Sequence, residues 1–373
     1  MSKKLRIGLN ATCFSSRPSG AKQRFIGVYT ELFKLMHDCE FIVYEPIDFQ
    51  IRDLFKDCNN VKYKVTPMKS YSRFQRNLAG FFYWRKEFLN STFDIFETFN
   101  FPIFSYGDHI SMITIHDLRG IHIEKSFIKK LFYKFSYNYT IQKSDVVITV
   151  SEFMKNELLK YFPKANIRVL YNGIDEKFFY RNNISMKLQK EILFEKYHLP
   201  DNYCLSVGHF EKRKNYSNLI LAIEILKKNM RPFPLIIVGN DSGEMQNLRR
   251  LISDKGLEKL IFLLEAITDK ELEILYRNSK FFIFPSTYEG FGIPIIEAMK
   301  FNIPCVLSDI EIFREIGIQD YLYFNPEDPS SIANTILLAV DKNKKIPKTS
   351  VFEKFKFYNL AKNLKDIYYG VLN

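Results

Sequence analysis

Short apolar runs along the chain alternate with longer segments in which apolar residues recur every three or four positions. The short runs predict buried strands, and the longer segments, among them 25–36, 129–142 and 152–161, predict helices. Such alternation is typical of parallel sheets covered by helices on both faces. Because the series starts afresh after a polar stretch through residue 183, we expect an α/β protein with two sheets joined at a hinge. The predicted strands span residues 5–10, 41–44, 94–97, 111–115, 145–150, 167–170, 203–207, 235–238, 260–263, 281–284 and 305–307.

Length and composition limit the class of protein. The chain has 373 residues, 46% of them hydrophobic, and chains above about 250–300 residues usually fold as more than one domain. No apolar run approaches the roughly 20 residues of a membrane span, and the first residues lead into a strand rather than a signal peptide. The five scattered cysteines suggest neither a disulfide framework nor a zinc pair. We therefore expect a cytoplasmic protein.

Positive charge is concentrated in the first half of the chain. Residues 1–180 hold 27 Lys and Arg against 18 Asp and Glu, which gives +9 of the total +12. In the stretches 68–86 and 125–134, basic residues are interleaved with aromatic ones. These stretches are either amphipathic helices whose cations face water, or surfaces that adsorb to an anionic membrane or a phosphate-bearing acceptor. No nucleic-acid-binding motif accompanies the charge.

The most informative motif is the segment 289–299, Glu-Gly-Phe-Gly-Ile-Pro-Ile-Ile-Glu-Ala-Met. It follows the apolar run 281–284, and Pro294 suits the start of a helix, so the segment is predicted to be strand, glycine loop and helix. Gly290 and Gly292 would let a ligand approach the backbone, and the N-terminus of a helix attracts anions.

Two carboxylates flank this glycine loop. Glu289 lies before the predicted helix and Glu297 in its predicted first turn, so they could hold hydroxyl groups on either side of a bound anion. A nucleotide sugar has this layout, with a diphosphate between two diols. The alternative is that acidic residues near a helix N-terminus only stabilise the helix dipole.

A second loop, 207–215, also lies between a predicted strand and a predicted helix. Arg213 and Lys214 would bring two cations next to free backbone N–H groups, which suits a diphosphate. The alternative is a solvated, charged surface loop.

Two features of the first half are further candidates. His116 follows a predicted strand, where a histidine is either a structural hydrogen bonder or a group that faces a ligand. The loop 10–24 contains Gly20, and its Lys22 or Arg24 could contact an anion. The alternative for this stretch is a plain surface loop.

Together these motifs resemble retaining glycosyltransferases of family 4. The two glutamates with seven residues between them match the family's E-x7-E signature. Arg213 and Lys214 match its donor-phosphate segment, although this chain has Gly208-His209 where Gly-Arg is common. The resemblance extends over most of the chain and is weaker in the first half.

The resemblance implies roles for these residues. His116 would approach the donor sugar at the reacting centre, and Glu289 would accept hydrogen bonds from sugar hydroxyls there. Glu297 would hold the ribose. The predicted donor-binding residues are Gly20, Gly208, His209, Arg213, Lys214, Gly290, Phe291, Gly292 and Glu297.

Members of this family have the GT-B fold, in which two Rossmann-like domains face each other across a cleft. The resemblance implies an acceptor-side domain at 1–176 and a nucleotide-sugar-binding domain at 177–350. Residues 351–373 would form a C-terminal helix that returns to the N-terminal domain.

The implied function is hexosyl transfer with retention of configuration, similar to bacterial surface-polysaccharide mannosyl- and rhamnosyltransferases. The donor would be a nucleotide sugar, with GDP-mannose favoured, and the acceptor a glycan or a lipid-linked glycan. The expected partners include an anionic membrane surface, at the inner face of the plasma membrane, but no nucleic acid. No Asp-x-Asp pair is present, so we expect neither a metal nor another cofactor, with Arg213 and Lys214 stabilising the leaving diphosphate.

Two other classes of protein remain open at this point. One is a nucleotide-sugar epimerase with the GT-B fold, which would need no acceptor. The other is a non-catalytic, basic protein that binds a membrane surface or a nucleic acid.

Overall fold

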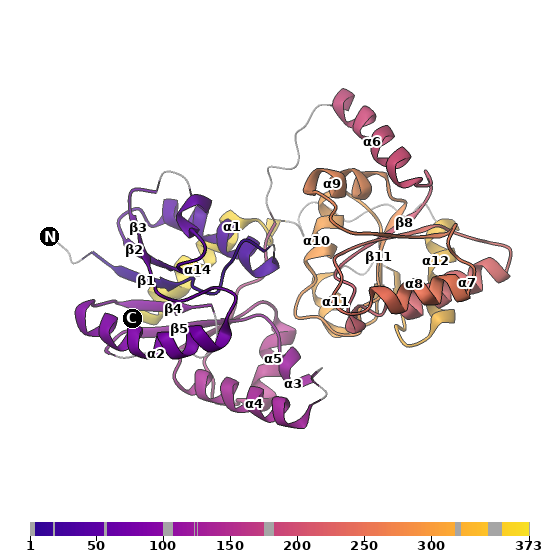
Figure 1. Ribbon diagram of the computed structural model, residues 1–373. Helices are drawn as coiled ribbons and strands as arrows, with labels where there is room; N and C mark the ends of the chain where they lie inside the picture. Colours follow the sequence, from indigo (N-terminus) through magenta and orange to yellow (C-terminus); the bar gives the residue numbers. More distant parts are fainter. Residues whose placement is uncertain are drawn as a thin grey trace. The chain divides into compact units, whose positions relative to one another are not determined.

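The computed structural model describes residues 4–17, 19–55, 58–99, 107–122, 124, 126–174, 183–317, 322–341 and 353–372. They belong to two compact units (Figure 1). Unit 1 comprises Met1–Asp175 together with Lys354–Asn373, and unit 2 comprises Glu176–Glu353. The predicted domain borders at 176 and 350 lie outside the described residues, as does nearly all of the stretch predicted to be a hinge.

A parallel sheet of seven strands forms the centre of unit 1, in the order β3-β2-β1-β4-β5-β6-β7. The order reverses at β1, because the chain builds β2 and β3 on one side of it and the later strands on the other. The inner strands β4 and β6 are buried at every residue, as expected for a sheet covered on both faces. The strands are β1 (Arg6–Asn10), β2 (Glu40–Glu45), β3 (Val61–Val65), β4 (Ile95–Thr98), β5 (Ile110–Ile115), β6 (Val146–Thr149) and β7 (Ile167–Val169).

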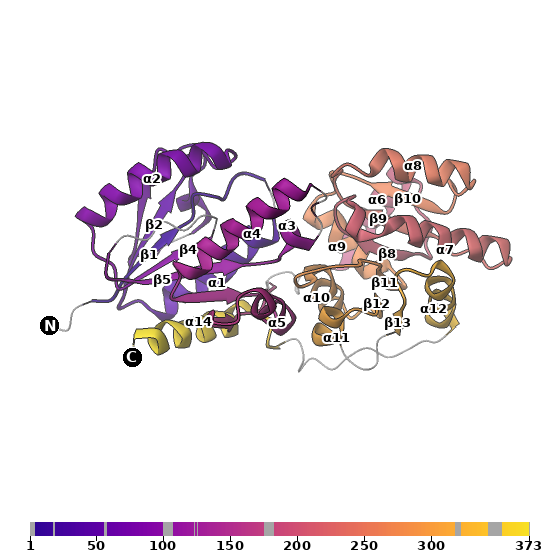
Figure 2. The same cartoon turned by 90° about the horizontal axis from the view of Figure 1, so that it is seen from below.

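Helices cover both faces of this sheet (Figures 1 and 2). On one face α1 and α14 pack against each other, and on the other lie α2 and α4. Right-handed crossover connections explain why α1 and α2 lie on opposite faces of the sheet. The chain moves in one direction across the sheet after β1 and in the other direction after β3. The helical elements are α1 (Gly20–Leu35), η1 (Ile51–Leu54), α2 (Arg73–Asn90), α3 (Arg119–His122), α4 (Phe127–Gln142), α5 (Glu152–Tyr161) and α14 (Phe357–Leu372).

Unit 2 is built on a parallel sheet of six strands in the order β10-β9-β8-β11-β12-β13, which reverses at β8. Its strands are β8 (Cys204–Val207), β9 (Leu235–Val238), β10 (Ile261–Leu264), β11 (Phe281–Phe284), β12 (Cys305–Ser308) and β13 (Leu322–Phe324). Its helical elements are α6 (Asn183–Tyr197), η3 (Lys212–Lys214), α7 (Tyr216–Lys228), α8 (Met245–Asp254), α9 (Asp269–Asn278), α10 (Ile293–Lys300), α11 (Glu311–Ile316) and α12 (Pro329–Asp341).

The first helix begins earlier than the apolar pattern predicts. The Ser19 hydroxyl accepts a hydrogen bond from the Lys22 N–H at 3.2 Å and caps α1. Residues 20–24, predicted to be loop, are therefore helical. The prediction also missed β3, because this edge strand carries exposed lysines instead of a continuous apolar run.

Candidate functional site

Two neighbouring strands of unit 2 bring the predicted motifs together. β8 and β11 pair in parallel, and the sheet order reverses at β8. The loop after β8 contains Arg213 and Lys214, and the loop after β11 contains Glu289. Open α/β sheets bind ligands outside the carboxyl ends of the strands at such a reversal, so the loops meet where a ligand is expected.

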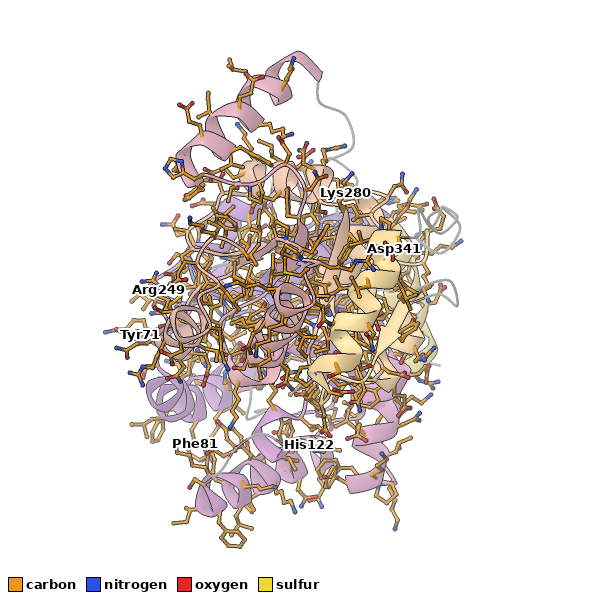
Figure 3. The ribbon with its side chains drawn as sticks, turned by 90° about the vertical axis from the view of Figure 1, so that its right-hand side faces the viewer. Tyr71, Phe81, His122, Arg249, Lys280 and Asp341 are labelled. Carbon is orange, nitrogen blue, oxygen red and sulfur yellow. The ribbon has the colours of Figure 1, made fainter. Side chains whose placement is uncertain are left out.

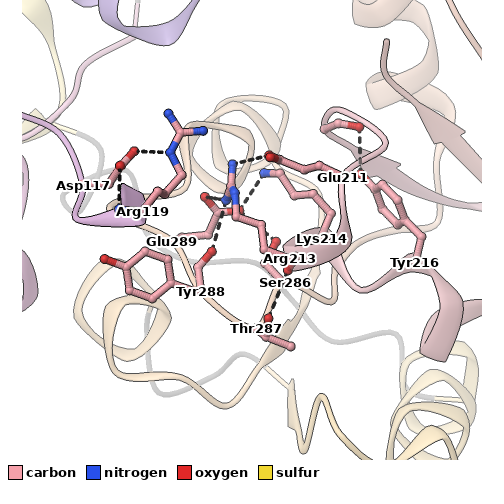
Figure 4. Close-up of polar contacts among 11 residues, drawn as sticks. Asp117, Arg119, Glu211, Arg213, Lys214, Tyr216, Ser286, Thr287, Tyr288 and Glu289 are labelled. Atoms are coloured by element: carbon pink, nitrogen blue, oxygen red, sulfur yellow. Dashed lines mark hydrogen bonds and ion pairs between the residues drawn. The ribbon is translucent and has the colours of Figure 1, made fainter. Parts of the chain in front are cut away.

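The Glu289 carboxylate lies between the two cations (Figure 4). Lys214 Nζ donates to its Oε1 at 2.6 Å, and the Ser286 hydroxyl donates to the same oxygen at 2.8 Å. Arg213 pairs with the other oxygen, Oε2. Arg213 also forms an ion pair with Glu211 at 2.5 Å and donates to the Tyr288 carbonyl at 3.1 Å. One guanidinium group and one ammonium group thus pair with two carboxylates.

Burial sets the ionisation of this cluster. Glu289 is only 8% exposed and Lys214 only 6%. Burial alone would raise the pKa of Glu289, but Lys214 and Arg213 lower it to about 2. Burial lowers the pKa of Lys214, although Glu289 opposes this change. Glu289 is therefore ionised at neutral pH and cannot serve there as a proton donor.

The backbone near Arg213 and Lys214 leaves little room for an additional side chain. Lys214 ends the short turn η3, and Asn215 has a left-handed conformation, with φ of 57°, before α7 begins at Tyr216. Arg213 and Lys214 therefore lie in the loop just before the helix, as predicted, within three residues of its first residue. A Cβ on Gly208 would lie 3.0 Å from Lys214 Cε, and Gly208 itself has φ of +158°. A side chain at this position would press on the lysine.

Glu297 differs from its predicted position. Gly292, with φ of +120°, caps α10, which begins at Ile293, so Glu297 lies in the second turn and not the first. Its Oε2 accepts a hydrogen bond from the Tyr276 hydroxyl at 2.8 Å. Burial raises the pKa of this half-buried carboxyl. Within the described residues its Oε1 accepts no hydrogen bond, so that oxygen can take one from a ligand.

The other predicted residues of unit 2 differ in exposure. Gly290 and Phe291 are buried beside Glu289. His209 is exposed. Sequence reasoning did not single out Glu211, Ser286 or Tyr276, although Glu211 lies inside the cationic loop and Ser286 lies three residues before the glycine motif. A polar residue at the end of a buried strand could have drawn attention to Ser286.

In unit 1, His116 follows β5 directly. It is half-buried, and burial with the neighbouring Arg24 lowers its pKa to about 3, so the ring is neutral at physiological pH. The next residue, Asp117, pairs with Arg119 at 2.7 Å (Figure 4). His116 and the Glu289 cluster belong to different units.

The predicted anion contacts of unit 1 have protein partners. Gly20 is the first residue of α1. Lys22 Nζ donates to the carbonyls of Ser15 and Ser16 at 2.8 and 3.1 Å. Arg24 is 2% exposed and donates to the Leu170 carbonyl at 3.2 Å.

No group of three or more His, Cys, Asp and Glu side chains able to hold a metal ion occurs within the part of the chain that the structure describes.

Two family models match the chain, one in each half. Residues 19–178 match Glycosyltransferase Family 4, and residues 189–350 match Glycosyl transferases group 1. The chain belongs to these glycosyltransferase families. The predicted resemblance is confirmed.

Curated relatives include enzymes of O-antigen synthesis. The chain is 31% identical over 226 residues to the O-antigen chain mannosyltransferase RfbU of Salmonella typhimurium, a match that covers 60% of this chain and 59% of that protein. It is 30% identical over 231 residues to the serotype-specific mannosyltransferase WbdA of Escherichia coli, covering 60% of this chain and 27% of the relative. A third match, to the O-antigen chain mannosyltransferase B of Escherichia coli, has 30% identity and covers 54% and 53% of the two chains.

Solved structures resemble the whole chain. Sucrose-phosphate synthase of Thermosynechococcus elongatus has a TM-score of 0.74 at 15% identity, over 99% of both chains. Anabaena HepE in complex with UDP and glucose has a TM-score of 0.72 at 17% identity, over 98% of this chain and 100% of HepE. Identities this low show the fold alone. The fold is GT-B, with two Rossmann-like units, and the predicted fold class is confirmed.

Proposed function

We propose that this protein transfers a hexose from a nucleotide sugar to a hydroxyl of a glycan or lipid-linked glycan in surface polysaccharide synthesis, with retention of anomeric configuration. The observation that supports this most is the buried cluster of Arg213, Lys214 and Glu289 at the reversal point of the unit 2 sheet. Such a concentration of ionised side chains in a buried place is typical of a site that takes a charged ligand.

Charge balance explains how the cluster would take a diphosphate. Arg213 and Lys214 already pair with Glu289 and Glu211. An arriving diphosphate would share these cations, and the Glu289 oxygens would then be able to accept hydrogen bonds from sugar hydroxyls. As the bond between sugar and phosphate breaks, negative charge grows on the leaving diphosphate, and preorganised cations stabilise that charge.

The remaining roles are those that the family resemblance implies, and the contacts of each side chain are compatible with them. Glu297 would bind the ribose through its Oε1, while Tyr276 holds the other oxygen. His116, neutral because of its low pKa, would act as a hydrogen-bonding group near the sugar. Since Glu289 stays ionised, we assign it no proton transfer. The leaving phosphate would instead take the proton of the acceptor hydroxyl on the same face of the sugar.

GDP-mannose is the favoured donor, because RfbU and the other curated relatives reported above are named mannosyltransferases. The test is incubation of the full chain with a panel of GDP- and UDP-sugars, with and without lipid-linked glycan acceptors. We expect GDP release from GDP-mannose that rises with acceptor, and an α-anomeric product by NMR. An isomerised donor without transfer would instead identify an epimerase. A lack of reaction with every donor, together with tight lipid or RNA binding, would identify a non-catalytic protein.

Metal independence is part of the proposal and has its own measurement. Because Arg213 and Lys214 supply the positive charge at the proposed diphosphate position, transfer should continue at its full rate in EDTA. Loss of activity with the chelator and recovery with Mn2+ or Mg2+ would contradict this assignment.

A further inference from the structure

The helix α4 of unit 1 turns an apolar side away from the protein core. Its buried residues are Tyr137, Thr140 and Ile141. Apolar residues on the other side recur every three or four positions and so form one continuous stripe. A surface helix of a globular protein usually places this stripe against the core. The stripe consists of Phe127, Ile128, Leu131, Phe132, Phe135 and Tyr139, which are 78%, 80%, 59%, 63%, 69% and 41% exposed.

The neighbouring helix α2 adds a second apolar surface on the same face of the sheet. Leu78, Phe81, Phe82 and Leu89 of this helix are 57%, 47%, 69% and 81% exposed. Figure 2 shows both helices in front of the unit 1 sheet, and Figure 3, in which Phe81 is labelled, shows side chains projecting from this part of the unit. We call the exposed side chains of these two helices the α2–α4 face.

The charge of the α2–α4 face has one sign. α4 contains three lysines and no acidic residue, and Lys129 and Lys134 are exposed. α2 exposes Arg85 and Lys86, while its single acidic residue, Glu87, is buried and paired with Lys64 at 2.5 Å. No ion pair to these exposed cations occurs within the described residues.

We propose that the α2–α4 face docks on an anionic lipid bilayer, with α4 lying in the plane of the interface and its apolar stripe inserted among the acyl chains. Apolar patches of this kind mark interaction sites. A helix that lies in the interface combines an apolar face with Lys and Arg near its edges, which approach the lipid phosphates. None of the described helices is long and apolar enough to cross a membrane, so attachment would occur from one side.

Charge favours a bilayer over a second copy of the chain. In a two-fold symmetric dimer, the same patch faces itself, and the lysines of α4 would lie against those of the other copy. A bilayer rich in anionic lipid accepts both the apolar stripe and the cations. The inference stands on the surface of unit 1 and does not depend on sugar transfer by the chain.

Flotation of the full chain with vesicles tests the proposal. The vesicles are phosphatidylglycerol mixed with phosphatidylcholine, and phosphatidylcholine alone. The double variant Leu131→Ser/Phe135→Ser removes two stripe residues one helical turn apart. We expect it to bind anionic vesicles about a hundredfold more weakly, tenfold for each side chain withdrawn from lipid. The control is Leu188→Ser/Ile192→Ser in α6, whose side chains have the same spacing and similar exposure, 59% and 57%, and it should bind as the parent does.

Insertion has a second, spectroscopic readout. The chain has one tryptophan, Trp84, which is 1% exposed. A Phe132→Trp variant should therefore add an emission that brominated acyl chains quench, whereas Ile192→Trp should add one that they do not. Circular dichroism and thermal unfolding verify that each variant folds.

Three results would overturn the proposal. The first is equal vesicle binding by the parent chain and the Leu131→Ser/Phe135→Ser variant. The second is complete release in high salt without quenching at position 132, because salt screens charge but not apolar burial, and adsorption by charge alone would then explain the binding. The third is a dimer in solution, measured by light scattering, that the same double variant converts to a monomer.

Discussion

At the scale of single residues, the Glu289 carboxylate forms ion pairs with both Arg213 and Lys214. Its pKa is lowered to about 2 because Lys214 and Arg213 overcome the effect of burial. Removing one partner of a buried ion pair leaves an uncompensated charge and costs about 3–5 kcal/mol. We therefore expect Glu289→Gln to lower the free energy of unfolding of unit 2 by about 3 kcal/mol in urea at neutral pH. The exposed Glu311 provides the control, and Glu311→Gln should change stability by less than about 0.5 kcal/mol.

The same carboxylate predicts a pH dependence. Its folded-state pKa of about 2 lies below the ordinary value of 4.5, so its ionised form adds stability above pH 4.5. That contribution is lost as the pH falls from about 4.5 towards 2. The stability difference between the parent chain and Glu289→Gln should stay constant from pH 8 to about 5 and shrink in stronger acid. A difference that persists unchanged at pH 3 would show that the pair is not the cause.

Glu297 tests the donor assignment. Glu297→Ala should weaken the binding of GDP or GDP-sugar roughly tenfold to a hundredfold, because a hydrogen bond to a charged group contributes about 1.5–3 kcal/mol. Glu289→Ala should mainly lower turnover. Tyr276→Phe, which keeps the Glu297 carboxylate but removes its hydrogen bond, should have a smaller effect on binding. Calorimetric titration and transfer rates separate these outcomes. Normal binding and turnover in both glutamate variants would make the assignment wrong.

At the scale of elements, the apolar runs and the turn residues that bound them predicted the strands whose loops form the site. β11 has the bounds that its apolar run predicts, because a strand buried on both faces must be apolar throughout, and β8 begins one residue later than predicted. The start of α1 was missed, since a serine cap outweighed the apolar period. The pairing of Lys214 with Glu289 joins residues 75 positions apart. Local pattern cannot predict such a contact, because it depends on the order of strands in the sheet.

The close approach of two backbone segments, at Gly208 after β8 and Gly239 after β9, gives a prediction at the scale of elements. A Cβ on Gly239, which follows β9, would lie 2.0 Å from the backbone oxygen of Gly208. Backbone cannot rotate away as a side chain can, so Gly239→Ala should displace the loop that carries Lys214. We expect a loss of about 1–3 kcal/mol of stability, as for other overpacked positions, together with weaker donor binding. Gly370→Ala in α14 meets nothing within 4 Å and serves as the control.

At the scale of the whole molecule, both ends of the chain build unit 1. Glu97 on β4 is fully buried and accepts hydrogen bonds from Tyr29 at 2.6 Å, Tyr368 at 2.6 Å and Thr114 at 3.1 Å. Burial raises the pKa of this carboxyl, and the hydroxyl donors oppose the change. Tyr368 lies on α14, 271 positions further along the chain. A hydroxyl donor so distant in sequence could not be predicted from the residues around Glu97.

Tyr368→Phe should therefore weaken unit 1 alone. The variant removes one of three hydroxyl donors from a buried carboxyl, which costs about 1–3 kcal/mol. Hydrogen exchange measured by mass spectrometry should show faster exchange in residues 4–174 and 354–372, which belong to unit 1, and unchanged exchange in residues 183–341 of unit 2. The adjacent Tyr369, 38% exposed, supplies the control, since Tyr369→Phe leaves the Glu97 donors intact. Faster exchange throughout unit 2 in the Tyr368 variant would mean that the two units unfold together. The two compact units would then not be independently stable.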